Sequence, residues 1–441
     1  MTISIVLQFV VVLAAIWMGA RYSGVGLGLW GAVGLLVLVV AFGVNPTSPP
    51  IDVMLIILAV IMAASVMDAA GGIDFLVRIA ERIIRANPKY VTIVAPLTTW
   101  TFTFLAGTGH IVYPLLPVIY ETAHQAGIRP ERPMAVATIA SQQAITASPV
   151  AAATAAMIGL FAEKGMTQWG LPQILMVCVP ATLTGVVAAA IVSMFIGKDL
   201  KDDAEYQARL ASGQVAAPKT AGERPPLKPA AKASAYLFLV GVALVVLLGF
   251  FPELRKLPGA KDALQMPIVI EIVMMAVAAV MLLVTKVDVN DIPKTSTLRA
   301  GVVAVIGIFG LAWLGDSFIA ANKDVIVPAI GAQADAHPWT FAFGLFFASV
   351  LLYSQAATTR ALMPLGIALG IPPQFLIAMF PSVNGYFFIP TYGSLIAAIN
   401  FDLSGTTKIG KYVLNHSFMI PGVVSTAVAV CTGLFLAKIM F

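Results

Sequence analysis

Residues 141–149 read Ser-Gln-Gln-Ala-Ile-Thr-Ala-Ser-Pro, a polar break inside a long apolar stretch. A counterpart at residues 382–390 reads Ser-Val-Asn-Gly-Tyr-Phe-Phe-Ile-Pro, and it also opens with Ser and closes with Pro. A second polar interruption precedes each break: Ala-Gly-Thr-Gly-His at 106–110 and Ser-Gln-Ala-Ala-Thr-Thr-Arg at 354–360. Interrupted apolar segments at matching places in two halves of a chain indicate the substrate site of a transporter.

The composition places these interruptions in a membrane. The chain has 441 residues, of which 59% are hydrophobic and 11% charged, whereas about a quarter of the residues in a soluble domain are charged. Apolar stretches of about 17–25 residues without alternation favour spanning helices over barrel strands. Cys178 and Cys431 both lie in apolar segments, so we expect two buried thiols and no disulfide framework. The first apolar run lacks a basic leader and is typical of a spanning helix.

We therefore expect an all-α polytopic fold that consists of two repeats. The first repeat, residues 1–197, contains these expected elements: scaffold helices within 3–70, an interrupted segment at 92–123, a broken helix at 134–160 and a helix at 171–197.

Residues 198–232 are rich in Lys, Asp, Ala and Pro and are predicted to form a flexible cytoplasmic linker. The second repeat, residues 233–441, contains these expected elements: scaffold helices within 234–320, an interrupted segment at 339–366, a broken helix at 374–400 and a final helix at 413–438.

Each interrupted segment could cross the membrane once or form a re-entrant hairpin with both ends on one side. If both are hairpins, most Lys and Arg of the loops fall on one face, together with Arg129, Arg132 and the linker. If both span, these basic residues lie outside, so the positive-inside rule favours hairpins and places both termini in the periplasm. Each repeat then has five spanning helices, one of them broken, plus a hairpin. The two repeats have inverted topology, and the hairpin tips meet near the midplane.

Interrupted backbone within a membrane is tolerated only where protein or a water-filled cavity surrounds it. We therefore expect the two tips and the two breaks to line a substrate cavity, although each polar side chain could instead serve helix packing. The candidate substrate-binding residues are Gly107, Thr108, Gly109, His110, Ser141, Gln142, Gln143, Thr146, Ser148, Ser354, Gln355, Thr358, Thr359, Arg360, Ser382 and Asn384.

Arg360 is the most informative charge among these candidates. A guanidinium within an apolar hairpin costs about 2.5–3.5 kcal/mol on insertion scales, and its fork matches a carboxylate. His110 occupies the corresponding place in the first hairpin and could donate to a second carboxylate or carry a proton. The alternatives are an Arg that reaches the surface or binds carbonyls, and a core His that is hydrogen-bonded to backbone.

Half-helices that restart after a break offer free N–H groups and partial positive charge to an anion. Ser148-Pro149 has the composition of such a start, with Ser at the cap and Pro at the first helical position. Ile389-Pro390 keeps the Pro without a capping side chain. We expect Arg360 to hold one substrate carboxylate, and the first tip with the Ser148 terminus to hold the other.

Asp68 and Asp316 end the third helix of each half, where repeat-related acids could couple ions or cap neighbouring backbone. The sequence contains no spacing typical of a metal site, no nucleotide-binding motif and no hydrolase motif. We therefore expect no cofactor, no nucleic-acid partner and no enzymatic activity.

Three stretches resemble the Dcu A/B-type anaerobic C4-dicarboxylate transporters. They are Gly-Thr-Gly-His with Ile-Val-Tyr-Pro at 107–114, Ser-Gln-Gln-Ala-Ile-Thr-Ala-Ser-Pro-Val-Ala-Ala at 141–152, and Phe-Asp-Leu-Ser-Gly-Thr-Thr at 401–407. The resemblance implies an inner-membrane carrier for fumarate, succinate, malate and aspartate that works chiefly as an exchanger. It also implies an elevator fold similar to the wider ion-transporter superfamily, usually dimeric and surrounded by membrane lipid. Some members of the family partner a sensor kinase, and the sequence leaves that partner open. An anion channel and a membrane-embedded dicarboxylate sensor are the alternative functions.

Overall fold

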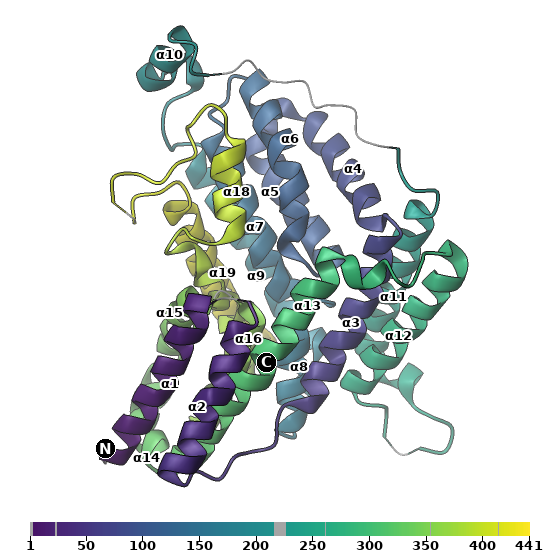
Figure 1. Ribbon diagram of the computed structural model, residues 1–441, viewed down its shortest axis with the longest axis vertical. Coiled ribbons are helices and arrows are strands. Elements are labelled where there is room, and N and C mark those ends of the chain that lie inside the picture. Colours follow the sequence, from purple (N-terminus) through teal and green to yellow (C-terminus); the bar gives the residue numbers. More distant parts are fainter. Residues whose placement is uncertain (1–2, 23, 216–225, 261, 353, 413) are drawn as a thin grey trace.

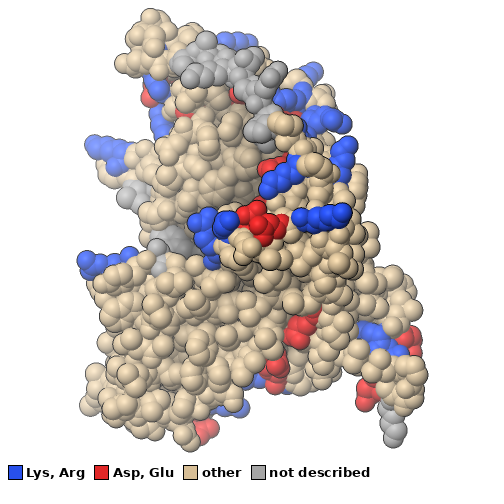
Figure 2. Space-filling model, turned by 45° about the vertical axis from the view of Figure 1, so that its right-hand side comes forward, with Lys and Arg blue, Asp and Glu red and all other residues tan. Residues whose placement is uncertain are grey.

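The computed structural model describes residues 3–22, 24–215, 226–260, 262–352, 354–412 and 414–441. In these ranges the chain is helical and contains no β-strand apart from two isolated bridges. Seven of the described helical stretches are long and apolar enough to cross a membrane. On the face drawn in Figure 2, large areas carry no charged side chain. The expected all-α polytopic class is therefore confirmed.

The first half of the chain contains nine α-helices (Figure 1). In chain order they are α1 Ile3–Tyr22, α2 Gly26–Phe42, α3 Ile51–Ala69, α4 Gly72–Arg85, α5 Val91–Ala106, α6 Val112–Gln125, α7 Glu131–Gln143, α8 Ala152–Glu163 and α9 Leu171–Ser193.

The second half runs from α11 to α19. These helices are α11 Ala231–Phe250, α12 Met266–Thr285, α13 Ser296–Gly307, α14 Trp313–Ala336, α15 Phe341–Leu352, α16 Gln355–Ala368, α17 Pro373–Met379, α18 Gly393–Phe401 and α19 Met419–Met440.

Each interrupted segment consists of two helices that pack on each other and meet at a short turn: α5 with α6, and α15 with α16. Gly107 ends α5 with a positive φ of 71°, and a Cβ there would lie 2.5 Å from the Val150 carbonyl oxygen. The Thr108 side chain then accepts from the His110 N–H at 3.3 Å. At the second turn, Ser354 accepts from the Ala357 N–H at 3.2 Å and caps α16. The positive φ of Gly107 and the hydrogen bonds to the Thr108 and Ser354 side chains thus shape the two tips.

The breaks also differ from regular helix. A 3-10 turn, Ala144–Ala147, and the non-helical residues 148–151 separate α7 from α8. A 3-10 run, Phe380–Phe387, follows α17, with Asn384 outside helical geometry at φ −102° and ψ 29°. Each break packs beside its hairpin, since α5 contacts α7 and α15 contacts the Phe380–Phe387 run.

The remaining helices surround these central elements. Helix α3 packs on α12 and α13, and α1, α2 and α14 lie side by side at one end (Figure 1). Helix α9 packs closely along α19, where a Cβ on Gly185 would meet the Ser425 carbonyl oxygen at 2.3 Å. A small residue such as Gly185 permits this close approach of two apolar helices.

Three element boundaries differ from the sequence expectation. The helix expected to end near residue 320 continues as α14 to Ala336, because Lys323 and Asp324 end the apolar run without breaking the helix. The linker contains α10, Ala204–Ala211, which Asp203 caps by accepting from the N–H groups of Glu205 and Tyr206. Linker residues 216–225 lie outside the described part of the chain.

The third difference concerns the last helix, which begins at Met419 instead of residue 413. Asp402 holds the preceding loop together, because its carboxylate accepts from the Ser404 and Thr407 N–H groups and from the Thr406 hydroxyl.

Candidate functional site

Both hairpin tips face one cavity of about 540 Å³. The first tip contributes the stretch Gly107 to His110, and the second contributes Ser354, Gln355 and Ala356. Gln142 from the first break also lines the cavity. The structure therefore brings together seven of the predicted site residues: Gly107, Thr108, Gly109, His110, Gln142, Ser354 and Gln355.

Four helix beginnings from the hairpins and broken helices border this cavity, beside those of α2 and α13. The 3-10 turn Gly109–Ile111 leads into α6, α8 contributes Ala152 and Ala153, α16 contributes its first residues, and Tyr392 is the N-cap of α18. The first N–H groups of a helix have no partner within that helix, and the helix dipole is positive at this end. A cavity bordered by four such ends favours a ligand with negative charge.

The cavity also contains a cation that the sequence analysis did not select. Arg299 lines it from α13, on the same helix face as Val303 and Gly307. The apolar run begins at residue 300, so the sequence alone places Arg299 in the preceding loop. The missed signal is Thr295, an N-cap whose side chain accepts from the Leu298 N–H at 3.2 Å and so extends the helix to include Arg299.

Arg360 does not line this cavity. Its side chain is 1% exposed, with Nη1 at 3.0 Å from Glu163 Oε2 and Nη2 at 3.3 Å from Asp316 Oδ2. Both guanidinium amino groups therefore already face carboxylates of the protein. The predicted contact between Arg360 and a substrate carboxylate would need a different conformation from this one.

Those ion pairs border a second cavity, of about 640 Å³, which Asp52, Glu163 and Asp316 line. Two helices connect the cavities. Helix α8 begins at the first cavity and ends at Glu163, and α16 begins at Gln355 and reaches the second cavity at Pro364. The Arg360 ion pairs thus lie between the two cavities and join α8 and α16 to α14.

The predicted hydroxyl donors mostly bond to nearby backbone and lie away from the cavity. The pairs of hydroxyl and accepting carbonyl are Ser141 with Thr138, Thr146 with Gln143, Thr358 with Ser354, Thr359 with Gln355, and Ser382 with Met379. Such bonds within a helical turn occupy the hydroxyl hydrogen. Sequence clustering predicted these residues as donors to substrate because it could not distinguish this local use.

The helix start predicted at Ser148-Pro149 is wrong. Helix α8 begins at Ala152 without a side-chain cap, and the Ser148 hydroxyl donates to the Phe104 carbonyl at 2.7 Å. Ser148 thus binds the C-terminal turn of α5, and residues 149–150 after it form a turn before the extended Ala151. The start predicted at Pro390 is also displaced, because α18 begins at Gly393.

Four buried amides connect the second tip to both breaks. Gln355 Nε2 donates to Gln142 Oε1 at 3.0 Å and to Asn384 Oδ1 at 3.1 Å. Asn384 Nδ2 donates to Gln143 Oε1 at 3.1 Å, and Gln143 Nε2 donates to the Thr426 hydroxyl at 2.7 Å. Gln143 and Asn384 therefore act through other side chains and do not line the cavity themselves.

The two repeat-related acids have different partners. Asp68 accepts from the Thr297 hydroxyl at 2.8 Å near the start of α13, whereas Asp316 faces Arg360. Within the described ranges, no group of three or more His, Cys, Asp or Glu side chains has the arrangement of a metal site.

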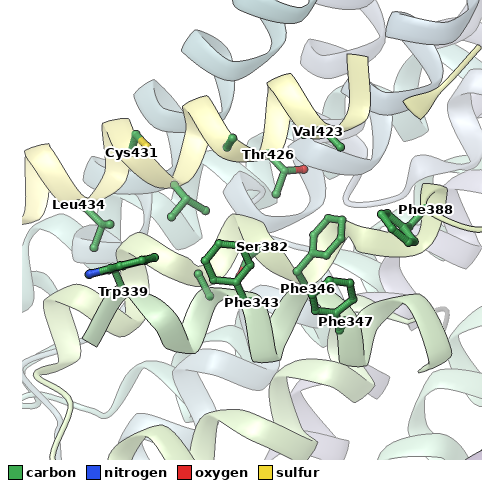
Figure 3. A pocket seen from close by; sticks show the side chains of 13 residues that line it. Trp339, Phe343, Phe346, Phe347, Ser382, Phe388, Val423, Thr426, Cys431 and Leu434 are labelled. Carbon is green, nitrogen blue, oxygen red and sulfur yellow. The ribbon is translucent and has the colours of Figure 1, made fainter. Parts of the chain in front are cut away.

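A third cavity, of about 590 Å³, has an apolar lining. Figure 3 shows Phe343, Phe346 and Phe347 of α15 facing Val423 and Leu434 of α19 across it. Lacking charged groups, this cavity suits hydrocarbon better than a dianion. Cys431 lines it and is exposed, so the expected burial holds for Cys178 alone.

Comparison with known proteins adds independent evidence. Residues 4–441 match the family described as anaerobic C4-dicarboxylate membrane transporters. The chain is 43% identical to the C4-dicarboxylate transporter DcuA of Escherichia coli K12 over 99% of this chain and 100% of that protein. It is 41% identical to DcuA of Wolinella succinogenes over the same shares. It is 39% identical to the anaerobic C4-dicarboxylate transporter DcuB of Escherichia coli O6:H1 over 97% of both chains.

Two solved structures have a similar fold. The YdaH transporter of Alcanivorax borkumensis superposes with a TM-score of 0.53 at 16% identity, over 93% of this chain and 89% of that chain. MtrF of Neisseria gonorrhoeae superposes with a TM-score of 0.53 at 12% identity, over 100% of this chain and 95% of that chain.

Proposed function

Because the chain belongs to the family of anaerobic C4-dicarboxylate membrane transporters, we propose that it exchanges C4-dicarboxylates across the bacterial inner membrane as a secondary carrier. Fumarate, succinate, malate and aspartate are the proposed substrates, and antiport by alternating access is the proposed mode. One observation carries the assignment of the site: four helix beginnings and Arg299 border the cavity between the two tips. A dianion in that cavity meets positive potential on several sides.

In this proposal the substrate carboxylates replace water at the helix N–H groups. Arg299, on α13, would contact one carboxylate, and the first tip with the start of α8 would contact the other. The Thr108 and Ser354 hydroxyl oxygens accept at their own turns, so each hydroxyl hydrogen stays available to donate to a substrate carboxylate. A bidentate guanidinium contact would favour carboxylates over halides.

The transport cycle follows from two cavities that α8 and α16 connect. The cavity at the tips lies beside Arg299, on the face that the loop charges assign to the cytoplasm, and the second cavity lies toward the periplasm. In this proposal the state is inward-facing, and the Arg360 ion pairs form the periplasmic closure. The hairpins and broken helices would move as a transport domain against a scaffold of the first three helices of each half. This is an elevator of two inverted repeats with both termini periplasmic. A homodimer remains our expectation, and a sensor-kinase partner remains open.

Reconstituted exchange tests this function. Proteoliposomes loaded with unlabelled succinate should take up labelled succinate faster than empty ones, because a carrier couples the two movements. An anion channel would show no such acceleration, and a sensor would show no flux. Repeating the assay with the four substrates, with and without Na⁺ and a pH gradient, ranks the substrates and identifies any coupling ion.

A further inference from the structure

The four-amide cluster has a fixed direction. Asn384 Nδ2 donates to the Pro381 carbonyl oxygen at 3.1 Å, and a backbone carbonyl can only accept. The amino group of Asn384 is therefore held on the Pro381 side, and its Oδ1 is directed to Gln355. A side-chain amide has one donating and one accepting end. The orientation of Asn384 therefore determines the orientation of each amide that is hydrogen-bonded to it in the cluster.

The orientation passes from Asn384 to the cavity through Gln355. Gln355 must present its Nε2 to Asn384 Oδ1, and the same Nε2 donates to Gln142 Oε1. Gln142 is thereby left with its amino group as the free end. Gln142 is 2% exposed and lines the cavity, and its Nε2 donates to no group in the described part of the chain.

The first tip lies directly against this amino group. A Cβ on Gly109 would lie 2.4 Å from Gln142 Nε2, so a side chain at this position would occupy the space beside the donor. Gly109 thus lets the turn of the first hairpin pass directly over the Gln142 amide. A donor that lines a cavity gains a hydrogen bond when a ligand or water accepts from it.

We propose that Asn384, anchored on the Pro381 carbonyl, orients Gln355 and Gln142 so that Gln142 Nε2 recognises a substrate carboxylate and rejects a carboxamide. This inference rests on the proposed function and adds a specificity-determining residue, Gln142, and a positioning residue, Asn384. Both carboxylate oxygens can accept, one from Gln142 Nε2 and the other from a helix N–H group, whereas a carboxamide has a single accepting oxygen and its NH₂ group must face one of these two donors. An unpaired donor of this kind is a strong basis for discrimination.

The other branch of the cluster provides a matched control. Gln143 is as buried as Asn384, at 0% exposed, and it also bonds to Asn384, but it lies on the side away from the cavity. Removing Gln143 leaves the Pro381 carbonyl to hold Asn384, so the orientation of Gln142 should persist. Removing Asn384 frees Gln355 and Gln142 to reverse together, because their mutual hydrogen bond can run in either direction.

The test uses proteoliposomes of the full chain that exchange labelled succinate, with unlabelled succinate or its monoamide, succinamate, as the competitor. The wild type should prefer succinate. In Asn384→Leu, equal populations of the two orientations should weaken succinate inhibition only about twofold, while succinamate gains a hydrogen bond and inhibits several-fold better. The preference should therefore fall by about tenfold. Gln143→Leu should keep the wild-type preference.

Three results would overturn the inference. The first is a wild type that shows no preference for succinate over succinamate, and the second is an Asn384→Leu protein in which inhibition by both competitors weakens equally. The third is a Gln143→Leu protein that loses the preference as much as Asn384→Leu does. If Asn384→Leu does not reconstitute, Gln142→Leu replaces it. This variant should weaken inhibition by succinate about tenfold and change inhibition by succinamate little. An unchanged preference in Gln142→Leu also overturns the inference. Failure of the wild type to exchange succinate would instead refute the proposed function.

Discussion

Replacing Arg360 by Met should destabilise the protein, because the change leaves two carboxylates without their cation. Arg360 is 1% exposed and lies 3.0 Å from Glu163 Oε2 and 3.3 Å from Asp316 Oδ2. At an effective dielectric constant of about 20, each pair is worth about 5 kcal/mol of Coulomb energy before desolvation is subtracted. Removing one partner of a buried pair typically costs about 3–5 kcal/mol.

The exposure of the two acids lowers that figure. The Glu163 side chain is 26% exposed and the Asp316 side chain 14% exposed, so water can partly solvate the orphaned carboxylates. We expect Arg360→Met to lower the free energy of unfolding by about 3 kcal/mol, the lower end of the range for buried pairs. Adding Asp316→Asn to this variant should recover part of the loss, because it removes one orphaned charge.

The assay is equilibrium unfolding in mild detergent, followed by tryptophan fluorescence during titration with a denaturing detergent. Arg299→Met is the control, because Arg299 is exposed in the cavity and its loss should change stability by less than about 0.5 kcal/mol. A stable Arg360→Met protein that no longer binds succinate would refute the reasoning. That result would indicate that the guanidinium binds substrate instead of anchoring the three helices.

Three further predictions follow from the site and its surroundings. Arg299→Met should raise the KM for succinate about tenfold or more, since one charge-assisted contact is lost; proteoliposome uptake measures it. Gly107→Ala should impair uptake and cost about 1–3 kcal/mol of stability, because φ is 71° and the new Cβ would meet the Val150 carbonyl oxygen; detergent unfolding measures the loss. Burial opposes the ionisation of Asp203, but hydrogen bonds from backbone N–H groups and Arg129 outweigh it and lower the pKa of Asp203. The contribution of Asp203 to stability is therefore complete above the ordinary pKa of Asp and is lost as the pH falls through the lowered pKa. The α10 amides should be protected from hydrogen exchange at neutral pH and should lose this protection in acid. Asp203→Asn should remove this pH dependence.

Much of the fold was predictable because the membrane restricts the choices. Apolar runs of helix length predicted the spanning helices, and their interruptions predicted the paired helices that end at Gly107 and begin at Gln355. These features depend on local sequence: a Gly with positive φ, a Ser cap and stretches too polar for lipid. Boundaries failed where the helix continues past the end of the apolar run, as at Lys323 within α14.

The meeting of the two tips at one cavity was predictable, and the side-chain chemistry of that cavity was less so. The tips were identified because polar backbone needs a cavity. Arg360, predicted to line that cavity, instead pairs with protein carboxylates, and Arg299, which was not predicted, lines it. The sequence presents Arg360 as an isolated intramembrane charge, and its partners Glu163 and Asp316 are distant in the chain. Arg299 resembles an ordinary loop cation until Thr295 is recognised as the cap of its helix. Long-range ion pairs and side-chain direction are properties of the assembled fold.

Protection of the tips by substrate tests the central claim most directly. In a Cys431→Ser background, single variants His110→Cys and Ser354→Cys place a thiol at each of the two tips that line the cavity. A membrane-impermeant thiol reagent should label both in detergent, and succinate should slow both reactions with the same half-maximal concentration. Wild-type Cys431, in the apolar cavity, should react at a rate that succinate does not change. If succinate protects neither tip, or slows the reaction of Cys431 equally, the cavity between the tips is not the dicarboxylate site.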